Sequence, residues 1–453
     1  MTGSPATVAM PPSAARLFAG VGERCAGVAE RSPTVLVAPS GFKECLPPRA
    51  VADAIADGVG RAMPSARIIR LPLADGGEGF VDELVRFGGG AIERIVVDGP
   101  VGDPVEVRLG LIGAGGQRTA VLEIADAAGL WRVPPGRRDP TRTDSRGVGQ
   151  MIHAALDRGI RRIVIGCGDS GVNDGGLGMA RALGVAFRDR GGAPVASAGA
   201  LADLAAIDLS GRDPRLAAAS IEVVVNPCAR LLGPDGVSRR YGPQKGATPA
   251  QVERLEAGLA RLAACIRRAT GCDVAQRRGA GASGGLGAGF TAFCGARLVS
   301  RFAFVRRHFG FDAALRAADL VITAEGCVDL QTVAGKMPGW VARQARRHGV
   351  PVIALAGRID LPPALRDACG FDALVEIAPP ACSPAESIAQ AARWLRERSA
   401  EVIGGIVVAG TRGRNRSGGA APLPGRRRDP GWRADVVCSS GPCGPGSIAV
   451  CPP

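Results

Sequence analysis

Aromatic residues are scarce in this 453-residue sequence, at 4% with a single tyrosine, whereas glycine occurs 66 times. A chain with so few rings and so many glycines is typical of loop-rich α/β packing rather than of a β sandwich. Histidine is scarce as well, and His153, His308 and His348 all lie within or beside predicted helices, away from the glycine-rich loops. Hydrolase chemistry through a serine–histidine pair is therefore a weak alternative.

Long apolar runs are also missing. No stretch of 18 uninterrupted apolar residues occurs, so the sequence predicts no transmembrane helix and no membrane partner. The start of the chain has no basic residue before Arg16 and no continuous apolar core, which argues against a signal peptide. Thirteen cysteines are present, but they are scattered and form no C-x-x-C pair, a distribution that favours reduced thiols. We expect a soluble protein of the cytoplasm.

Acidic residues are outnumbered, and the formal net charge of +14 raises the question of nucleic-acid binding. Part of the excess lies in residues 402–453, which hold seven arginines against two aspartates. The rest is spread thinly along the chain, without aromatic residues interleaved among the basic ones. The sequence therefore predicts no nucleic-acid partner.

Lysine is the rarest charged residue. Only Lys43, Lys245 and Lys336 stand among 56 basic residues, and all three fall in glycine- or proline-rich loops. Lysine carries a compact ammonium, whereas arginine carries a planar guanidinium. Because this chain uses arginine almost everywhere else, the three lysines indicate sites that need a point charge. The alternative, three lysines left by chance, would more often place at least one on a helix face.

Five apolar runs have the form of buried parallel strands that alternate with helical patterns. They cover residues 34–38, 68–73, 320–323, 352–355 and 374–377. In the 2-1-3-4-5 strand order of flavodoxin-like folds, the binding crevice lies between the first and third strands. There the loop at 40–43 would meet Glu325, although the two are far apart in sequence.

A second domain interrupts this sheet, because residues 91–130 contain three strand-like runs joined by turns, a pattern of antiparallel pairing. The fold class is α/β, with one discontinuous flavodoxin-like parallel sheet and an inserted mixed α/β domain. We assign 33–90 and 297–401 to the flavodoxin-like domain and 91–296 to the insertion; 1–32 is expected to be a disordered extension and 402–453 a low-complexity disordered tail. A chain trimmed to residues 33–401 is expected to keep full turnover.

The stretch 318–336 carries the strongest functional pattern. An apolar strand ends in a loop with Glu325 and Asp329, and Lys336 stands at the start of the next helical pattern. Carboxylates and a lysine at the carboxyl end of a buried strand suit a metal–phosphate group. The alternative is a surface loop with solvated charges.

Four other loops combine glycine with charge. They hold Asp75, Gly76, Gly77 and Glu78; Asp174 and Gly175; Lys245; and Gly284 with Gly285. Residues 279–284 match G-x-G-x-x-G literally, but no strand precedes them and no acidic residue follows until Asp312, so a nicotinamide site is disfavoured. The sequence contains no G-x-x-x-x-G-K-[ST] motif, which excludes a P-loop.

These loops together resemble the bacterial glycerate kinases of the first class, the glycerate 2-kinase family. The matching stretches are Ala38-Pro39-x-x-Phe42-Lys43, Leu73-Ala-Asp-Gly-Gly-Glu-Gly79, Asn173-Asp-Gly-Gly176, Leu232-Gly-Pro, Gly242-Pro-Gln-Lys-Gly-Ala247, the glycine run 281–287, and Thr323-x-Glu-Gly-x-x-Asp329-x-Gln-Thr332 with Gly335-Lys336. They occur in family order over about residues 34–400. The resemblance implies two α/β domains and ATP-dependent phosphorylation of the 2-hydroxyl of glycerate with Mg²⁺.

The resemblance also implies roles for particular residues. Phosphoryl transfer needs cations on the phosphates, carboxylates for the metal and a group that orients the hydroxyl. Catalytic roles are expected for Lys43, Asp75, Asp174 and Glu325; nucleotide binding for Lys245, Lys336, Gly76, Gly77, Gly175, Gly284 and Gly285; and metal binding for Glu78, Glu325 and Asp329. Which carboxylate is the base stays open. The expected partners are glycerate and ATP, and a homodimer is the one assembly considered.

Three loops depart from the commonest family pattern. Ser40-Gly41 and Asn226-Pro227 each replace a segment with a carboxylate, whereas Asp169 adds one. These changes keep two alternatives open: a kinase for another small hydroxy acid, and a non-catalytic binding protein on the same fold.

Overall fold

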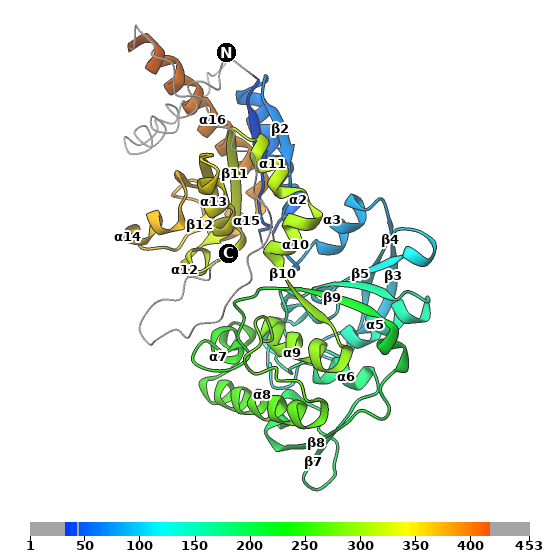
Figure 1. Cartoon of the computed structure of the whole chain (residues 1–453). Helices are drawn as coiled ribbons and strands as arrows, with labels where there is room; N and C mark the ends of the chain where they lie inside the picture. Colours follow the sequence, from blue (N-terminus) through cyan, green and yellow to red (C-terminus); the bar gives the residue numbers. More distant parts are fainter. Residues whose placement is uncertain (1–31, 43–44, 417–453) are drawn as a thin grey trace.

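The computed structural model describes residues 32–42 and 45–416. The first of its two domains contains the predicted parallel sheet (Figure 1). Five strands run in the order β13-β12-β11-β1-β2, which is the predicted 2-1-3-4-5 order, and all neighbours are parallel. Their bounds are β1 Thr34–Val37, β2 Arg67–Arg70, β11 Leu320–Val328, β12 Val352–Ile359 and β13 Ala373–Glu376. Because β11 extends beyond the predicted 320–323, Glu325 lies within the strand, opposite Ala356, rather than in a loop after it.

Helices cover both faces of this sheet, since successive strand residues point to opposite sides. Val35 and Val37 belong to an apolar cluster with α2 and α16, whereas Leu36 belongs to a second cluster with α10, α11 and α13. The bounds are α2 Pro48–Ala62, α10 Arg301–His308, α11 Phe311–Ala317, α13 Met337–Arg347 and α16 Ala391–Arg416, with the short helices α12 Leu330–Val333, α14 Pro363–Arg366 and α15 Pro384–Ala389.

A second sheet forms the core of the other domain, with the strand order β10-β9-β6-β5-β4-β3. Its bounds are β3 Ala91–Asp98, β4 Pro104–Ile112, β5 Thr119–Glu123, β6 Arg162–Gly166, β9 Ser220–Val225 and β10 Arg297–Ser300. β3, β4 and β5 pair antiparallel, as predicted, and the remaining strands pair parallel. The sheet continues to Ser300 in β10, so the inserted domain does not end at 296 as expected from the sequence.

The remaining helices of this domain fall into two groups, one that packs on the sheet and one that forms a separate apolar cluster with a small two-stranded ribbon (Figure 1). They are α4 Ile124–Ala128, α5 Arg146–Asp157, α6 Leu177–Ala182, α7 Val237–Tyr241, α8 Pro249–Thr270 and α9 Ala282–Cys294, and β7 Ala186–Asp189 pairs with β8 Leu204–Asp208 in a small ribbon. The predicted cap of α8 is present: Thr248 Oγ1 accepts a hydrogen bond from the Gln251 backbone, and Gln251 reciprocates in a capping box.

The two domains share one apolar cluster. Phe80 of α3 (Phe80–Phe87) and Phe304 of α10 lie with ring centroids 5.5 Å apart, and the same cluster includes Val224 of the second sheet and Leu36 of the first. Both sheets therefore pack against a common apolar layer, and the loops that follow their parallel strands meet at one place.

The C-terminal boundary of the first domain lies beyond residue 401. Helix α16 runs on to Arg416, and Val402, Ile403 and Ile406 are at most 4% exposed in the cluster that includes α2. The expectation of a disordered tail starting at 402 is therefore wrong for residues 402–416, because these apolar side chains recur on one helix face despite the glycines between them. The expectations for residues 1–31 and 417–453 lie outside the described residues.

A chain ending at residue 401 is expected to be clearly less stable than one ending at 408. Truncation removes three buried side chains, and each contributes about 1.5–3 kcal/mol on burial, so the loss is roughly 5 kcal/mol. Thermal melting of the two chains measures the difference. Equal melting temperatures would contradict the packing of α16 on α2.

None of the helices within residues 32–42 and 45–416 is both long and apolar enough to cross a bilayer.

Candidate active site

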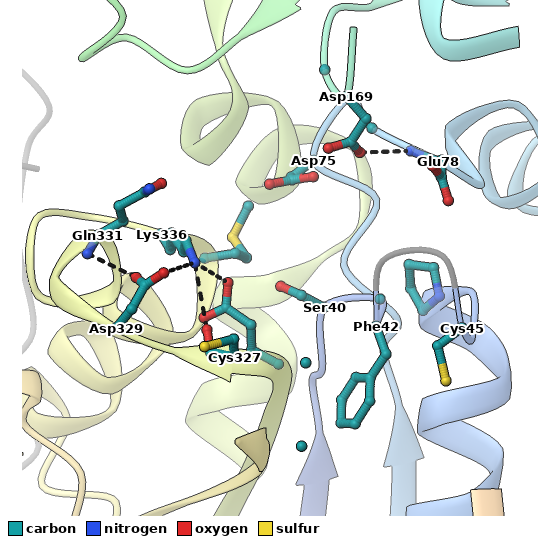
Figure 2. A pocket seen from close by; sticks show the side chains of 18 of the residues that line it. Ser40, Phe42, Cys45, Asp75, Glu78, Asp169, Cys327, Asp329, Gln331 and Lys336 are labelled. Atoms are coloured by element: carbon teal, nitrogen blue, oxygen red, sulfur yellow. Dashed lines mark hydrogen bonds and ion pairs between the residues drawn. The ribbon is translucent and has the colours of Figure 1, made fainter. Parts of the chain in front are cut away.

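A cleft of about 790 Å³ lies between the two domains. Its lining comes from segments that follow parallel strands in both sheets: Ser40 after β1, Glu325 in β11, Asp169 after β6 and Asn226 after β9. Carboxyl ends of parallel strands are where α/β sheets bind ligands. The crevice predicted between the first and third strands is thus one wall of this cleft (Figure 2).

Lys336 lies at the centre of a charged cluster on that wall. Its Nζ is 3.2 Å from Glu325 Oε1 and 3.0 Å from Asp329 Oδ2, and it donates to the Cys327 carbonyl at 3.4 Å (Figure 2). Thr332 Oγ1 donates to the other Glu325 oxygen at 3.0 Å. The cluster is largely enclosed, with the Glu325 side chain 13% exposed.

The two carboxylates of this cluster differ in their surroundings. Burial raises the pKa of Glu325 above its usual value, and the Lys336 ammonium partly offsets that rise. Asp329 is tied to the backbone as well, since its Oδ1 accepts from the amides of Gln331 and Thr332 and caps α12. Glu325 is therefore the more adaptable carboxylate, whereas Asp329 also orders the loop.

Arg301 joins two segments of the cleft that the sequence analysis treated separately. One guanidinium nitrogen pairs with Asp75 Oδ2 at 2.7 Å, and the other donates to the Gly335 carbonyl at 3.0 Å, next to Lys336. Arg301 was not singled out from the sequence, because it is one of 53 arginines and stands in no motif. Arg301 reaches the cleft because strand β10 pairs with the second sheet and ends at Ser300, immediately before Arg301 begins α10.

The opposite wall brings Asp169 against the loop that holds Glu78. Asp169 Oδ2 accepts a hydrogen bond from the Glu78 amide at 3.2 Å (Figure 2). The close approach explains the glycine beside it, since a Cβ on Gly77 would lie 2.2 Å from that oxygen. Asp169 itself has φ of 49°, a left-handed conformation that costs a non-glycine residue about 1–3 kcal/mol. Such backbone strain is typical of functional sites.

Lys245 is buried in the second-domain wall at 3% exposure. Its Nζ donates to Ser170 Oγ at 3.1 Å and to the Val172 carbonyl at 2.6 Å. Desolvation lowers the pKa of Lys245 to about 7, although nearby Asp174 and Cys167 act in the opposite direction. An anion that binds beside Lys245 would favour the charged ammonium and draw a proton onto it near neutral pH.

The low pKa of Lys245 predicts a pH dependence of stability. The unfolded chain keeps this proton up to the ordinary lysine pKa of 10.5 and the folded chain only up to a pKa of about 7, so stability should rise between those values and be lowest below pH 7. In a Lys245→Met variant this component is missing. Denaturant unfolding at several pH values should show that the free energy of unfolding of the parent rises relative to that of the variant from pH 7 to 10. Parallel profiles would contradict the assignment.

Several predicted site residues lie outside the cleft lining. Asp174 is 1% exposed, and its carboxylate accepts from the amides of Ser145, Gly176 and Gly178 and from the Ser145 hydroxyl, so it secures helices α5 and α6. Gly175 and Gly285 approach each other closely in the core, and Gly76 lies against the Val224 carbonyl. Lys43 lies outside the described residues.

The remaining predicted residues do line the cleft: Asp75, Gly77, Glu78, Lys245, Gly284, Glu325, Asp329 and Lys336. No histidine is among the lining residues, so the described residues offer no support for a serine–histidine hydrolase.

The three predicted metal ligands are not gathered into one cage. Within the described part of the chain, no group of three or more acidic, cysteine or histidine side chains is placed to hold a metal ion. Mg²⁺ in kinases usually takes one or two carboxylates together with substrate phosphates, so a cage is not required. The oxygen donors Glu325 and Asp329 on one wall fit that chemistry, while Glu78 stands on the other (Figure 2).

Two α/β domains that meet at a cleft lined by lysines and carboxylates are typical of an α/β enzyme that binds anionic ligands. The sequence model of the glycerate kinase family matches residues 35–407. The glycerate kinase of Bacillus subtilis (strain 168) is 40% identical over 378 residues, covering 83% of this chain and 98% of that protein. The glycerate 2-kinase of Escherichia coli (strain K12) is 41% identical over 326 residues, covering 72% and 85%.

A solved structure agrees with these relatives. A protein assigned as a glycerate kinase 2 from Salmonella typhimurium LT2 matches with a TM-score of 0.65 and 40% identity, over 85% of this chain and 99% of that one. The chain therefore belongs to the glycerate kinase family, as its motifs predict.

Proposed function

We propose that this protein is an ATP-dependent glycerate 2-kinase, which transfers the γ-phosphoryl group of ATP to the 2-hydroxyl of glycerate and releases ADP and 2-phosphoglycerate. The observation that carries the proposal is the enclosed Glu325–Lys336–Asp329 cluster at the carboxyl end of β11. Family membership and the glycerate 2-kinase name of one relative support the choice of substrate and of hydroxyl.

In this mechanism the protein supplies position and charge. The ammonium of Lys336 stabilises the negative charge that develops on the transferred phosphoryl group, and the buried setting strengthens that effect. Asp75 is held by Arg301 and orients the attacking hydroxyl, whose proton it accepts as the new O–P bond forms and the bond to ADP breaks. Carboxylates such as Glu325 would help hold Mg²⁺, which when bound would neutralise phosphate charge.

The cleft also suits a kinase in its size. Its volume of about 790 Å³ is large for a three-carbon acid alone and falls within the range of pockets that take nucleotide-sized ligands.

We place the enzyme in the cytoplasm, because Cys167, Cys265, Cys294 and Cys369 are all buried free thiols, which suits a reducing compartment.

ADP release over a panel of small hydroxy acids tests the proposal. We expect ADP to form with ATP, Mg²⁺ and glycerate together, and to be near background when any one is omitted. Faster release with another hydroxy acid would favour that acid as the substrate. No release with any acid would favour a non-catalytic binding protein.

A further inference from the structure

The lining of the cleft divides into two lobes of different chemistry. The apolar lobe belongs to the first domain and is built by Leu46, Pro48, Ile377, Pro379, Pro380 and Ile388. The polar lobe belongs to the second domain and contains Ser170, Asn226, Gln244, Lys245 and Ser283. Lys336 and Arg301 line the cleft as well, and among the described residues Arg301 alone hydrogen-bonds both Asp75 and Gly335.

The apolar lobe is suited to a flat ring system. Prolines make its walls stiff, and Ile377 at 1% exposure forms part of its base. The floor beside it is flat, because Phe42 lies against Gly326 and Gly357, which carry no side chains. Ala378 lines this lobe, and its backbone N–H has no hydrogen-bond partner among residues 32–42 and 45–416. Apolar walls with a few backbone donors are the usual surroundings of a bound base.

The polar lobe is suited to a small anion. As an ammonium, Lys245 has three N–H donors, and within residues 32–42 and 45–416 two of them are used, by Ser170 and Val172. The ammonium lines the cleft although it is 3% exposed, so a ligand group beside it would be largely desolvated. A single carboxylate can pair with a buried cation that has a spare donor. A nucleotide base would bind poorly against such a group.

We propose that the two domains divide the substrates, with the nucleoside of the nucleotide in the apolar lobe of the first domain and the carboxylate of the hydroxy acid against Lys245 in the second. This inference rests on the proposed function and assigns its two ligands to separate walls. Lys336 and Arg301 then lie between them, where the phosphoryl group has to pass.

Two variants separate the lobes. Ala378→Trp fills the apolar lobe, and we expect it to weaken ADP binding at least tenfold while glycerate binding stays within about twofold of the parent. Lys245→Met removes the buried cation, and we expect the reverse. Calorimetric titration with ADP and with glycerate measures both, and thermal melting checks folding. If a first variant does not fold, Ser387→Trp tests the apolar lobe, and Gln244→Glu, at an exposed position beside the buried Lys245, tests the polar lobe.

Weaker ADP binding in Lys245→Met with unchanged binding in Ala378→Trp would overturn the division, as would equal losses of both ligands in both variants. A parent protein that binds neither ADP nor ATP would instead contradict the proposed function itself. The two failures are therefore distinguishable, because the division is tested by comparing the variants with the parent and the function by the parent alone.

Discussion

Replacing Glu325 with glutamine is expected to lower turnover on the order of 10²-fold while the melting temperature changes little. The substitution keeps the volume and the hydrogen bond from Thr332, which the amide can still accept, but removes a negative charge that is 13% exposed beside Lys336. Losing one electrostatic partner in a closed site typically has an effect of this size. Turnover as a function of Mg²⁺ concentration is the measurement, and a carboxylate that helps hold Mg²⁺ should also show a weakened Mg²⁺ dependence.

The matched control is Glu397→Gln, which removes the same charge from an exposed pair with Arg393 on α16. Pairs of this kind contribute about 0.3–0.5 kcal/mol, so turnover should stay at the parent level. Asp329→Asn provides a second comparison, because asparagine also caps helices and should keep α12 ordered. Parent-like turnover in both Glu325→Gln and Asp329→Asn would mean that this cluster is not part of the active site.

Replacing Lys336 with methionine is expected to lower turnover on the order of 10³-fold. The ammonium is the only cation that the described residues place between Glu325 and Asp329, and removing it leaves both carboxylates without their counter-charge. Cations that stabilise transferring phosphoryl groups have effects of about this size or larger. Turnover under saturating substrates measures the loss, and a modest fall in melting temperature should accompany it.

The arginine variant at this position tests the geometry of the charge. Lys336→Arg restores a cation, so it should recover the melting temperature, but the planar guanidinium is not a point charge and turnover should stay low. Arg343→Lys on the same helix is the control and should have a small effect. Full recovery of turnover in Lys336→Arg would leave the argument from scarce lysines without support.

The sheet order and the main loops could be predicted from the sequence because local signals determine them. Strands such as Thr34–Val37 are buried along their whole length, and a parallel sheet of five strands has few allowed topologies. The α8 helix was equally readable, since Thr248 and Gln251 form a capping box.

What could not be predicted depends on contacts between distant segments. Arg301 gains its role only because β10 joins the second sheet, which also shifts the domain boundary past 296. Asp174 has the sequence surroundings of a site residue, yet its four hydrogen bonds fix helix ends in the core. No local pattern distinguishes a carboxylate that faces a ligand from one that caps a helix.

The most direct test of the account is to identify the phosphorylated product formed from glycerate and ATP with Mg²⁺, by phosphorus NMR of the complete reaction. The account predicts 2-phosphoglycerate and ADP in equal amounts from the parent, and a far smaller yield of the same product from Glu325→Gln and Lys336→Met. Phosphate on the 3-hydroxyl, or no phosphorylated acid at all while the protein is folded, would contradict it.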